Sequence, residues 1–198
     1  MQKMKHSFLR SIACSIALCA PLTLLADCSG TPSQTYDLNS VQANISVRTG
    51  QKSQIIIYEP NVIALYDSER IVVRGKNQGL TYLPQSQWVE KLPKLVQNRL
   101  IQSFENTSSY KSVGRPSDHI SAGTLLTTDI RAFDINEEAR EAVVEISAKI
   151  IRQGSGKIET TRIFIARTPV RTIDGAGSST ALNDALQNVL RQIVSWGG

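Results

Sequence analysis

Two histidines and three cysteines are the residues of this 198-residue chain best suited to metal binding or nucleophilic catalysis. His6, Cys14 and Cys19 lie in the first 20 residues, so only His119 and Cys28 remain for the rest of the chain. One histidine and one cysteine are too few for the Cys and His ligands of a zinc site. A Ser-His-Asp triad would have to use His119, and no Gly-x-Ser-x-Gly motif is present to supply its serine. We therefore expect no catalytic residue, metal or cofactor; a hydrolase that uses His119 is the alternative.

Two glycine-containing stretches partly match nucleotide-binding loops. In residues 154–157, "GSGK", the Walker pattern fails because Ile151 replaces its first glycine and Ile158 replaces its Ser or Thr. In residues 175–180, "GAGSST", Thr180 replaces the third glycine of the dinucleotide fingerprint, and no parallel βαβ unit is expected around it. We interpret the first stretch as a turn and the second as a capped loop. An acidic group is expected to be a solvated turn, with weak cation binding as the alternative: Glu137, Glu138 and Glu141.

The first 27 residues have the pattern of a secretion signal. The opening "MQKMKHSFLR" is basic, and residues 11–26 are apolar and uncharged. An apolar run of about 16 residues, at ~1.5 Å per residue, is shorter than the ~30 Å hydrocarbon core of a membrane. Removal of residues 1–27 leaves 19 basic and 16 acidic residues, a net charge of +3. That modest charge does not require a nucleic-acid partner, and we expect none.

The motif "LADC" at the end of this signal resembles a bacterial lipobox. Leu25, Ala26 and Cys28 fit the pattern, whereas Asp27 stands where a small neutral residue is usual. The resemblance implies cleavage between Asp27 and Cys28 and acylation of Cys28, with palmitate among the possible chains; cleavage by the ordinary signal peptidase is the alternative. Ser29 at the next position implies export to the outer membrane. The predicted organisation is therefore a signal peptide (1–27), a lipidated N-terminus and flexible tether (28–35), and one domain (36–198).

The rest of the chain alternates between strand and helix patterns. Residues 141–152 alternate apolar and polar side chains, and a glycine-bearing turn at 153–157 connects them to a partner strand at 158–167. Residues 86–106 have helical spacing, with Ser86 as a candidate N-cap and Pro93 either kinking the helix or lying in its first turn. Between residues 182 and 196 the apolar side chains recur at helical spacing and form one stripe: Leu182, Leu186, Val189, Ile193 and Trp196. We expect the last helix to start at Ser179 or Thr180 and to end at Gly197. Further strands are expected at 54–60, 69–75, 79–84 and 124–135. Residues 40–53 are expected to mix strand and loop, and 110–113 to form a possible short strand.

These elements predict an α+β fold. Local hairpins favour antiparallel pairing, because parallel neighbours need long connections. We expect a mostly antiparallel sheet with two long helices packed on one face. Trp88 and Trp196 lie on the apolar stripes of the two helices and are interpreted as core residues, with a partly exposed partner surface as the alternative.

From residue 55 onward the chain resembles the auxiliary lipoproteins of ABC-type transport systems whose substrate-binding component is an MCE protein. The resemblance rests on "LYDSERIVVR" (65–74), "LTYLPQSQWVEKLPKLVQNRLIQSFEN" (80–106), "VGRPSD" (113–118), "IRAFDI" (130–135), "VVEISAKII" (143–151) and the last helix, which ends in tryptophan. The pattern departs from the family at 121–126, where an Asp-Tyr pair is usual.

The resemblance implies a non-enzymatic protein that tethers or docks a lipid transporter at the outer membrane. Its implied partners are an MCE-domain protein, the membrane through the lipid anchor, and a possible second copy in a homo-oligomer. The alternative function is a periplasmic lipid carrier with an apolar cavity.

Overall fold

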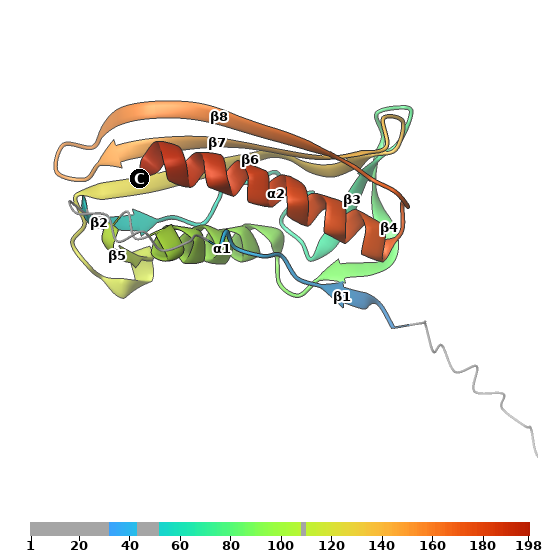
Figure 1. The fold of residues 1–198 in the computed structure, drawn as a ribbon, viewed down its shortest axis with the longest axis horizontal. Helices are drawn as coiled ribbons and strands as arrows, with labels where there is room; N and C mark the ends of the chain where they lie inside the picture. Colours follow the sequence, from blue (N-terminus) through green and yellow to red (C-terminus); the bar gives the residue numbers. More distant parts are fainter. Residues whose placement is uncertain (1–31, 43–51, 108–109) are drawn as a thin grey trace, which may run out of the picture. The chain divides into compact units, whose positions relative to one another are not determined.

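The computed structural model describes residues 32–42, 52–107 and 110–198 of the chain (Figure 1). The predicted signal peptide, the cleavage position at Asp27 and the lipidation site Cys28 lie outside these residues. None of the helices in the described part is long and apolar enough to cross a membrane.

The described residues form eight strands, two α-helices and one 3₁₀ helix, which confirms the α+β class. In chain order the elements are β1 (Gln34–Tyr36), β2 (Lys52–Ile57), β3 (Arg70–Arg74), β4 (Leu80–Trp88), α1 (Leu92–Thr107), β5 (Tyr110–Gly114), η1 (Pro116–Asp118), β6 (Thr124–Asn136), β7 (Glu141–Arg152), β8 (Lys157–Pro169) and α2 (Gly175–Gly197).

Strand β6 is the centre of the sheet and has three strand partners. One edge pairs antiparallel with β7 along its length, and the other edge is divided between two parallel strands. Strand β2 pairs with residues 124–126, and β3 pairs with residues 134–136. Between them Asn61 completes the edge: its N–H donates to the Thr128 carbonyl at 2.8 Å, and its carbonyl accepts from the Ile130 N–H at 2.9 Å. The backbone of β6 therefore has partners on both sides, as a buried strand requires.

The sheet is mixed, and its longest ladders are antiparallel, in broad agreement with the predicted mostly antiparallel sheet. The antiparallel pairings are β3–β4, β6–β7 and β7–β8, and the last two are the longest. Four further pairings among the described strands, β1–β4, β2–β5, β2–β6 and β3–β6, are parallel. Short connections between neighbouring strands indicate only antiparallel pairs, whereas the parallel partners of β2 and β3 follow much later, after a connection that contains α1.

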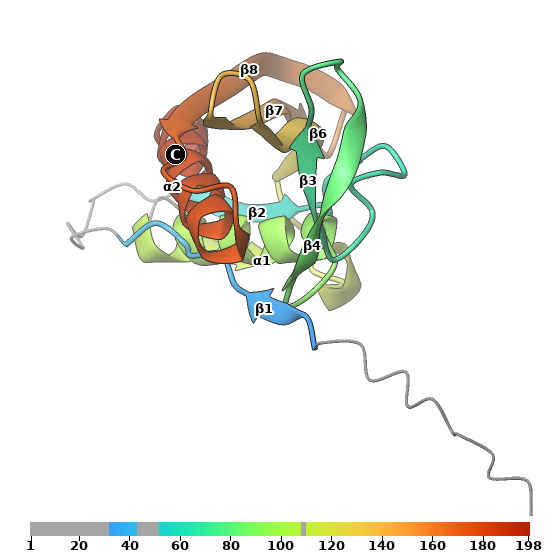
Figure 2. The ribbon, with the colours of Figure 1, turned by 90° about the vertical axis from the view of Figure 1, so that its right-hand side faces the viewer.

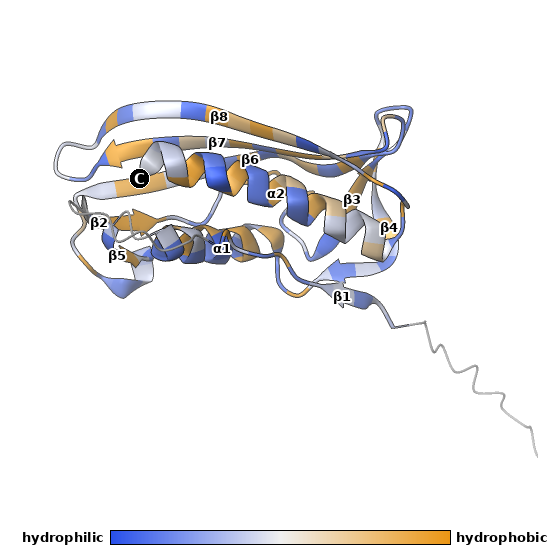
Figure 3. Ribbon diagram, viewed as in Figure 1, coloured by the Kyte–Doolittle hydropathy of each residue, from blue (hydrophilic) through white to orange (hydrophobic). Residues whose placement is uncertain are grey.

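The two helices lie against the sheet and against each other. Helix α2 packs mainly on β7 and β8, and α1 packs on β5, β2 and α2 (Figure 2). Apolar and polar residues alternate along α2 in Figure 3, and its buried side is apolar, with Leu182, Leu186, Val189 and Ile193 at zero exposure. Burial of such side chains contributes about 1.5–3 kcal/mol each, so these contacts dominate the stability of the fold.

The start of the first helix corrects one expectation. Helix α1 begins at Leu92 with Pro93 in its first turn, so the alternative of a proline kink is wrong. Ser86 is not an N-cap, because Ser86 and Trp88 belong to β4 and pair there with β1. Trp88 is a core residue, as predicted, but it reaches the core from a strand and makes an edge-on contact with Phe133, with 6.0 Å between ring centroids.

Helix α2 begins earlier than its apolar stripe indicates. Its N-cap is Asp174, whose carboxylate accepts from the Gly177 N–H at 2.7 Å, and not Ser179 or Thr180. The stretch interpreted as a loop is therefore the first turn of the helix. Glycine is required at its third position, because a Cβ on Gly177 would lie 2.2 Å from the Thr172 carbonyl oxygen. The predicted end at Gly197 is confirmed.

We expect Gly177→Ala to destabilise the protein by about 2 kcal/mol. Alanine normally favours a helix by up to about 1 kcal/mol over glycine, but here the new methyl group would collide with backbone, and overpacking costs about 1–3 kcal/mol. The control is Gly154→Ala, where a Cβ meets nothing within 4 Å. Urea unfolding measures both changes, and equal stability of the two variants would contradict this account.

Candidate functional site: attachment strap and buried polar triad

Residues Asp37–Val41, here called the strap, follow β1 and lie against the two helices. The strap crosses both helices and is bonded to each by its backbone. The Asn39 N–H donates to Asn183 Oδ1 on α2 at 2.8 Å, and the Val41 N–H donates to Ser103 Oγ on α1 at 3.0 Å. The Val41 carbonyl accepts from Asn106 Nδ2, also on α1, at 2.8 Å. These side-chain bonds fix the position of the strap, since no strand pairs with it in the described structure.

An ion pair and apolar burial hold the strap down. Arg99 Nη2 lies 2.6 Å from Asp37 Oδ1, which also accepts from the Leu38 N–H at 2.7 Å. The Asp37 side chain is 54% exposed, so this ion pair contributes no more than about 1 kcal/mol. The side chain of Leu38 is fully buried, and its burial contributes about 1.5–3 kcal/mol. Apolar burial therefore contributes most of the stability of the strap, and the hydrogen bonds determine which strap residue lies beside which helix residue.

The folded domain begins before the strap, at β1. Gln34 and Thr35, which were predicted to belong to the tether, pair with Ser86 and Gln87 of β4. The Val89 N–H extends this contact by donating to the Tyr36 carbonyl at 2.9 Å. Sequence analysis missed β1 because three residues carry no periodic pattern. Gln34 and Thr35 therefore belong to the fold and not to the predicted tether.

His119 lies at the surface, beside the backbone of its own turn. It is exposed, it follows η1 in a left-handed conformation with φ 54°, and its Nδ1 lies 2.7 Å from the Ser117 carbonyl oxygen. The adjacent Asp118 accepts from the Arg115 N–H at 2.7 Å and so closes its own turn. Among the described residues there is no group of three His, Cys, Asp or Glu side chains placed to bind a metal ion.

The other candidate motifs serve as turns or helix ends. Residues 154–156 lie in the predicted turn between β7 and β8, and Lys157 begins β8. Glu137 and Glu138 are exposed in the turn between β6 and β7, while Glu141 has entered β7 and lies 3.8 Å from Arg167. The three glutamates therefore do not form one cluster: two lie in the turn, as predicted, and the third lies in β7 beside an arginine.

A buried triad of polar side chains lies where β3 joins β6. Asp134 is 1% exposed and accepts from Tyr66 Oη at 2.6 Å and from Arg74 Nη2 and Nε at 3.0 and 3.2 Å. Burial, followed by the hydrogen bond and negative charge of Asp134, raises the pKa of Tyr66 well above its usual range. The hydrogen bond from Arg74 to Asp134 raises the pKa of Arg74. The triad is satisfied internally, which is the condition for burying a carboxylate without a large cost.

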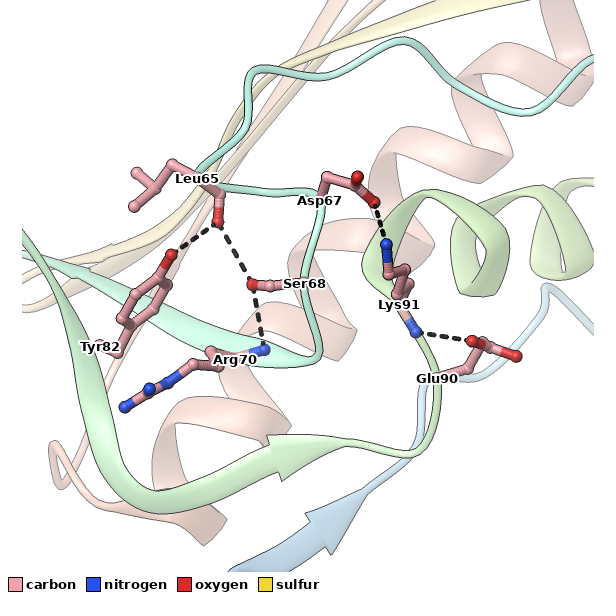
Figure 4. Close-up of polar contacts among 7 residues, drawn as sticks. All are labelled: Leu65, Asp67, Ser68, Arg70, Tyr82, Glu90 and Lys91. Atoms are coloured by element: carbon pink, nitrogen blue, oxygen red, sulfur yellow. Dashed lines mark hydrogen bonds and ion pairs between the residues drawn. The ribbon is translucent and has the colours of Figure 1, made fainter.

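The loop that leads to Tyr66 is tied to its neighbours by a set of polar contacts (Figure 4). The Leu65 carbonyl accepts from Ser68 Oγ at 3.3 Å and from Tyr82 Oη of β4 at 3.4 Å. Lys91, just before α1, contacts Asp67 Oδ1 at 3.2 Å through its Nζ. The loop is thereby connected both to β4 and to the start of α1.

The family model for the ABC-type transport auxiliary lipoprotein component matches residues 36–194. The chain belongs to this family. A curated relative, an uncharacterized protein of Bradyrhizobium diazoefficiens, is 29% identical over 172 residues, which cover 84% of this chain. The chain spans about half the length of that relative, 46%.

Two solved structures share the fold. Protein XCC0632 from Xanthomonas campestris is similar with a TM-score of 0.76 and 21% identity, covering 83% of this chain and 94% of that one. A second structure, whose protein is described only as uncharacterized, has a TM-score of 0.68 and 11% identity, covering 84% of this chain and 99% of its own. At these identities the likeness concerns the fold alone.

Several segments that carry the family resemblance contact one another, or the first helix, through side-chain hydrogen bonds. Residues 65–74 supply Tyr66 and Arg74, and residues 130–135 supply Asp134, so two segments form the triad. Residues 113–118 meet the first helix through Arg115 Nη2, which donates to Asn98 Oδ1 at 2.8 Å. The sequence analysis missed both contacts. Its available signal was Asp134, a carboxylate between Phe133 and Ile135 in an otherwise apolar strand end, which needs a buried partner.

We expect Asp134→Ala to lower the free energy of unfolding by about 2–4 kcal/mol. The substitution leaves Arg74 and Tyr66 without their acceptor. Breaking a fully buried ion pair lowers the free energy of unfolding by about 3–5 kcal/mol, and we expect a somewhat smaller loss because Arg74 is 27% exposed. The matched control is Asp67→Ala, whose ion pair with Lys91 is about half exposed and should cost less than about 1 kcal/mol. Chemical denaturation compares the two; similar losses would show that the triad has no special role.

Tyr66 should make the protein sensitive to alkaline conditions. Its pKa is raised in the folded state above the ordinary 10.0, so its contribution is fully present below pH 10. Above pH 10 the unfolded chain releases this proton first, and stability falls by up to about 1.4 kcal/mol per pH unit. We expect Tyr66→Phe to be less stable at neutral pH and to lose this additional slope above pH 10. Urea midpoints measured from pH 7 to 11 test this, and parallel curves for the two proteins would refute it.

Proposed function

We propose that this protein is a non-enzymatic auxiliary lipoprotein that holds an MCE-type ABC lipid transporter at the outer membrane. The observation that carries the proposal is the family match over residues 36–194, which begins eight residues after the lipobox cysteine Cys28. In this proposal acyl chains on Cys28 fix the domain to the periplasmic face of the outer membrane. The folded domain docks an MCE-domain substrate-binding protein, and homo-oligomers of the domain could match a symmetric transporter.

The short connection between Cys28 and the fold supports a role in positioning. Only five residues separate Cys28 from Gln34, the first residue of β1. A fully extended chain spans at most about 3.6 Å per residue, so the β1 end of the domain would remain within about 20 Å of the acylated cysteine. The strap then transmits this attachment to both helices. A longer tether would allow the domain a wider range of distances from the acylated cysteine.

Confinement near a membrane makes weak docking sufficient. Each acyl chain contributes about 0.8 kcal/mol per buried methylene, and two or more chains give a stable anchor. Once anchored, the domain meets a membrane-bound partner at a raised effective concentration, so a small interface can serve. No step of this mechanism needs a reacting group on the protein.

The hollow beside the strap does not support a lipid-carrier function. A hollow between the strap and the helices is lined largely by polar side chains, including Asp37, Ser40, Arg99, Gln102 and Gln187. Such a lining does not suit an acyl chain, which needs an apolar cavity.

We expect Cys28→Ser to release the protein from the membrane. The variant should appear in the buffer-washed soluble fraction of cell envelopes and should not incorporate radioactive palmitate, whereas the unaltered protein incorporates label and remains bound. Asp27→Ala serves as the matched variant: it keeps the cysteine, restores a small residue before it, and should be processed at least as completely. An unlabelled wild-type protein that washes off in plain buffer would overturn the anchoring proposal.

Docking is tested separately by purification from detergent-solubilised membranes. An MCE-domain protein should co-purify with the wild-type protein and much less with Cys28→Ser, because confinement is lost. Recovery of unrelated proteins only would overturn the transporter assignment while leaving the anchoring result intact. Native mass spectrometry of the same sample would reveal a stoichiometric bound lipid if the protein were a carrier.

A further inference from the structure

Strand β8 forms an open edge of the sheet in the described structure. It pairs with β7 on one side, and no described strand pairs with its other side. Residues 157–163, at the start of the strand, are all exposed. An edge strand presents a row of backbone N–H and C=O groups that can pair with a further strand. At thirteen residues β8 is long for such an edge, and edges of this kind are usually shortened or covered.

A bulge in β8 places its exposed isoleucines on one face. Ile150 pairs with Thr160 and Ile151 with Ile158, so Glu159 is an extra residue in the ladder. Because paired residues share a face, Ile158 joins Ile163 and Ile165 on the face opposite α2. These three side chains, here called the isoleucine row, are 52%, 51% and 44% exposed. Without the bulge Ile158 would point to the other face.

The opposite face of the same edge is basic. Arg152, Lys157 and Arg162 lie on it, by the register with β7. Arg152 pairs with Glu159, while Lys157 and Arg162 have no acidic partner among the described residues. The Arg162 guanidinium lies 5.4 Å from the ring centroid of Phe164, which leaves its charge available. The edge therefore combines apolar side chains on one face with unneutralised positive charge on the other.

We propose that the β8 edge binds an extended segment of a partner protein by strand addition. The segment alternates apolar and acidic residues: its apolar side chains lie beside the isoleucine row, and its acidic side chains face Lys157 and Arg162. Backbone hydrogen bonds supply affinity, and the two faces supply specificity. The proposal concerns a surface and holds whatever the partner's identity, so it goes beyond the proposed function.

Charge favours such a partner over a second copy of this chain. Two β8 edges that pair antiparallel about a two-fold axis perpendicular to the sheet keep their faces, so the isoleucine rows would lie on one shared face and the basic side chains on the other. Like charges on neighbouring strands are destabilising. A lipid surface would satisfy the charges and the isoleucines but not the backbone groups of the edge.

The test uses the detergent-extracted full-length protein and three synthetic heptapeptides. The first alternates Glu and Val, the second alternates Lys and Val, and the third is the Glu/Val peptide with every backbone nitrogen methylated, so that neither of its edges can donate hydrogen bonds. Amide hydrogen exchange, read by mass spectrometry, reports protection of residues 157–168. We expect the Glu/Val peptide to protect this segment and the other two to leave it unchanged. Absence of protection, or equal protection by the methylated peptide, would overturn strand addition.

Substitutions on the two faces complete the test. Arg162→Glu should weaken binding of the Glu/Val peptide at least about tenfold, equivalent to 1.4 kcal/mol, and should favour the Lys/Val peptide. Lys76→Glu, an exposed charge reversal in the β3–β4 turn, is its control. Ile163→Asp should also weaken binding, whereas Ile63→Asp, at a position 58% exposed, should not. Protection that rises with protein concentration alone would identify a second copy, and stronger protection by phosphatidylglycerol vesicles than by peptide would identify a membrane; either result would overturn the proposal.

Discussion

The division of one β6 edge between two parallel strands is the constraint on which the rest of the fold depends. Every backbone group of a buried strand needs a partner, and β6 obtains its partners from β2, from Asn61 and from β3 in turn. The Asn61 side chain strengthens the middle contact by donating to Asp129 Oδ1 at 3.1 Å. The triad of Tyr66, Arg74 and Asp134 then closes the junction with β3. These contacts therefore account for the stability of the sheet around β6.

The proposed attachment and the proposed strand addition involve different parts of the molecule. The strap and β1 join the N-terminal region to α1, α2 and β4, whereas the open edge belongs to β8. In Figure 1 the β7–β8 turn lies at the opposite end of the sheet from β1. An anchor at β1 would therefore leave the basic part of β8 accessible to a partner. This arrangement requires rigid connections between the two ends, which the long strands β6, β7 and β8 provide.

The sequence predicted local features well and distant ones poorly. The predictions of a strand at 141–152, of the glycine turn after it and of the partner strand were correct, because each depends on a sequence pattern within a short segment. The last helix was found, but its start was not, because Gly175 and Gly177 indicate a loop until the close approach of Thr172 is known. Strand β1 and the parallel pairs depend on residues far apart in the chain. Asp134 was visible as a polar residue in an apolar strand, whereas its partners could not be inferred from spacing.

The long-range pairing of β6 also determines a folding order. Val72 pairs with Asp134, 62 positions later, whereas β6, β7 and β8 are joined by turns of four residues. Closing long loops costs more entropy, and folds with distant contacts assemble slowly. The C-terminal meander can form first and then serve as a template for β2 and β3. Strands β2 and β3 therefore lack these partners until residues 124–136 are in place, and their apolar side chains need protection from aggregation until then.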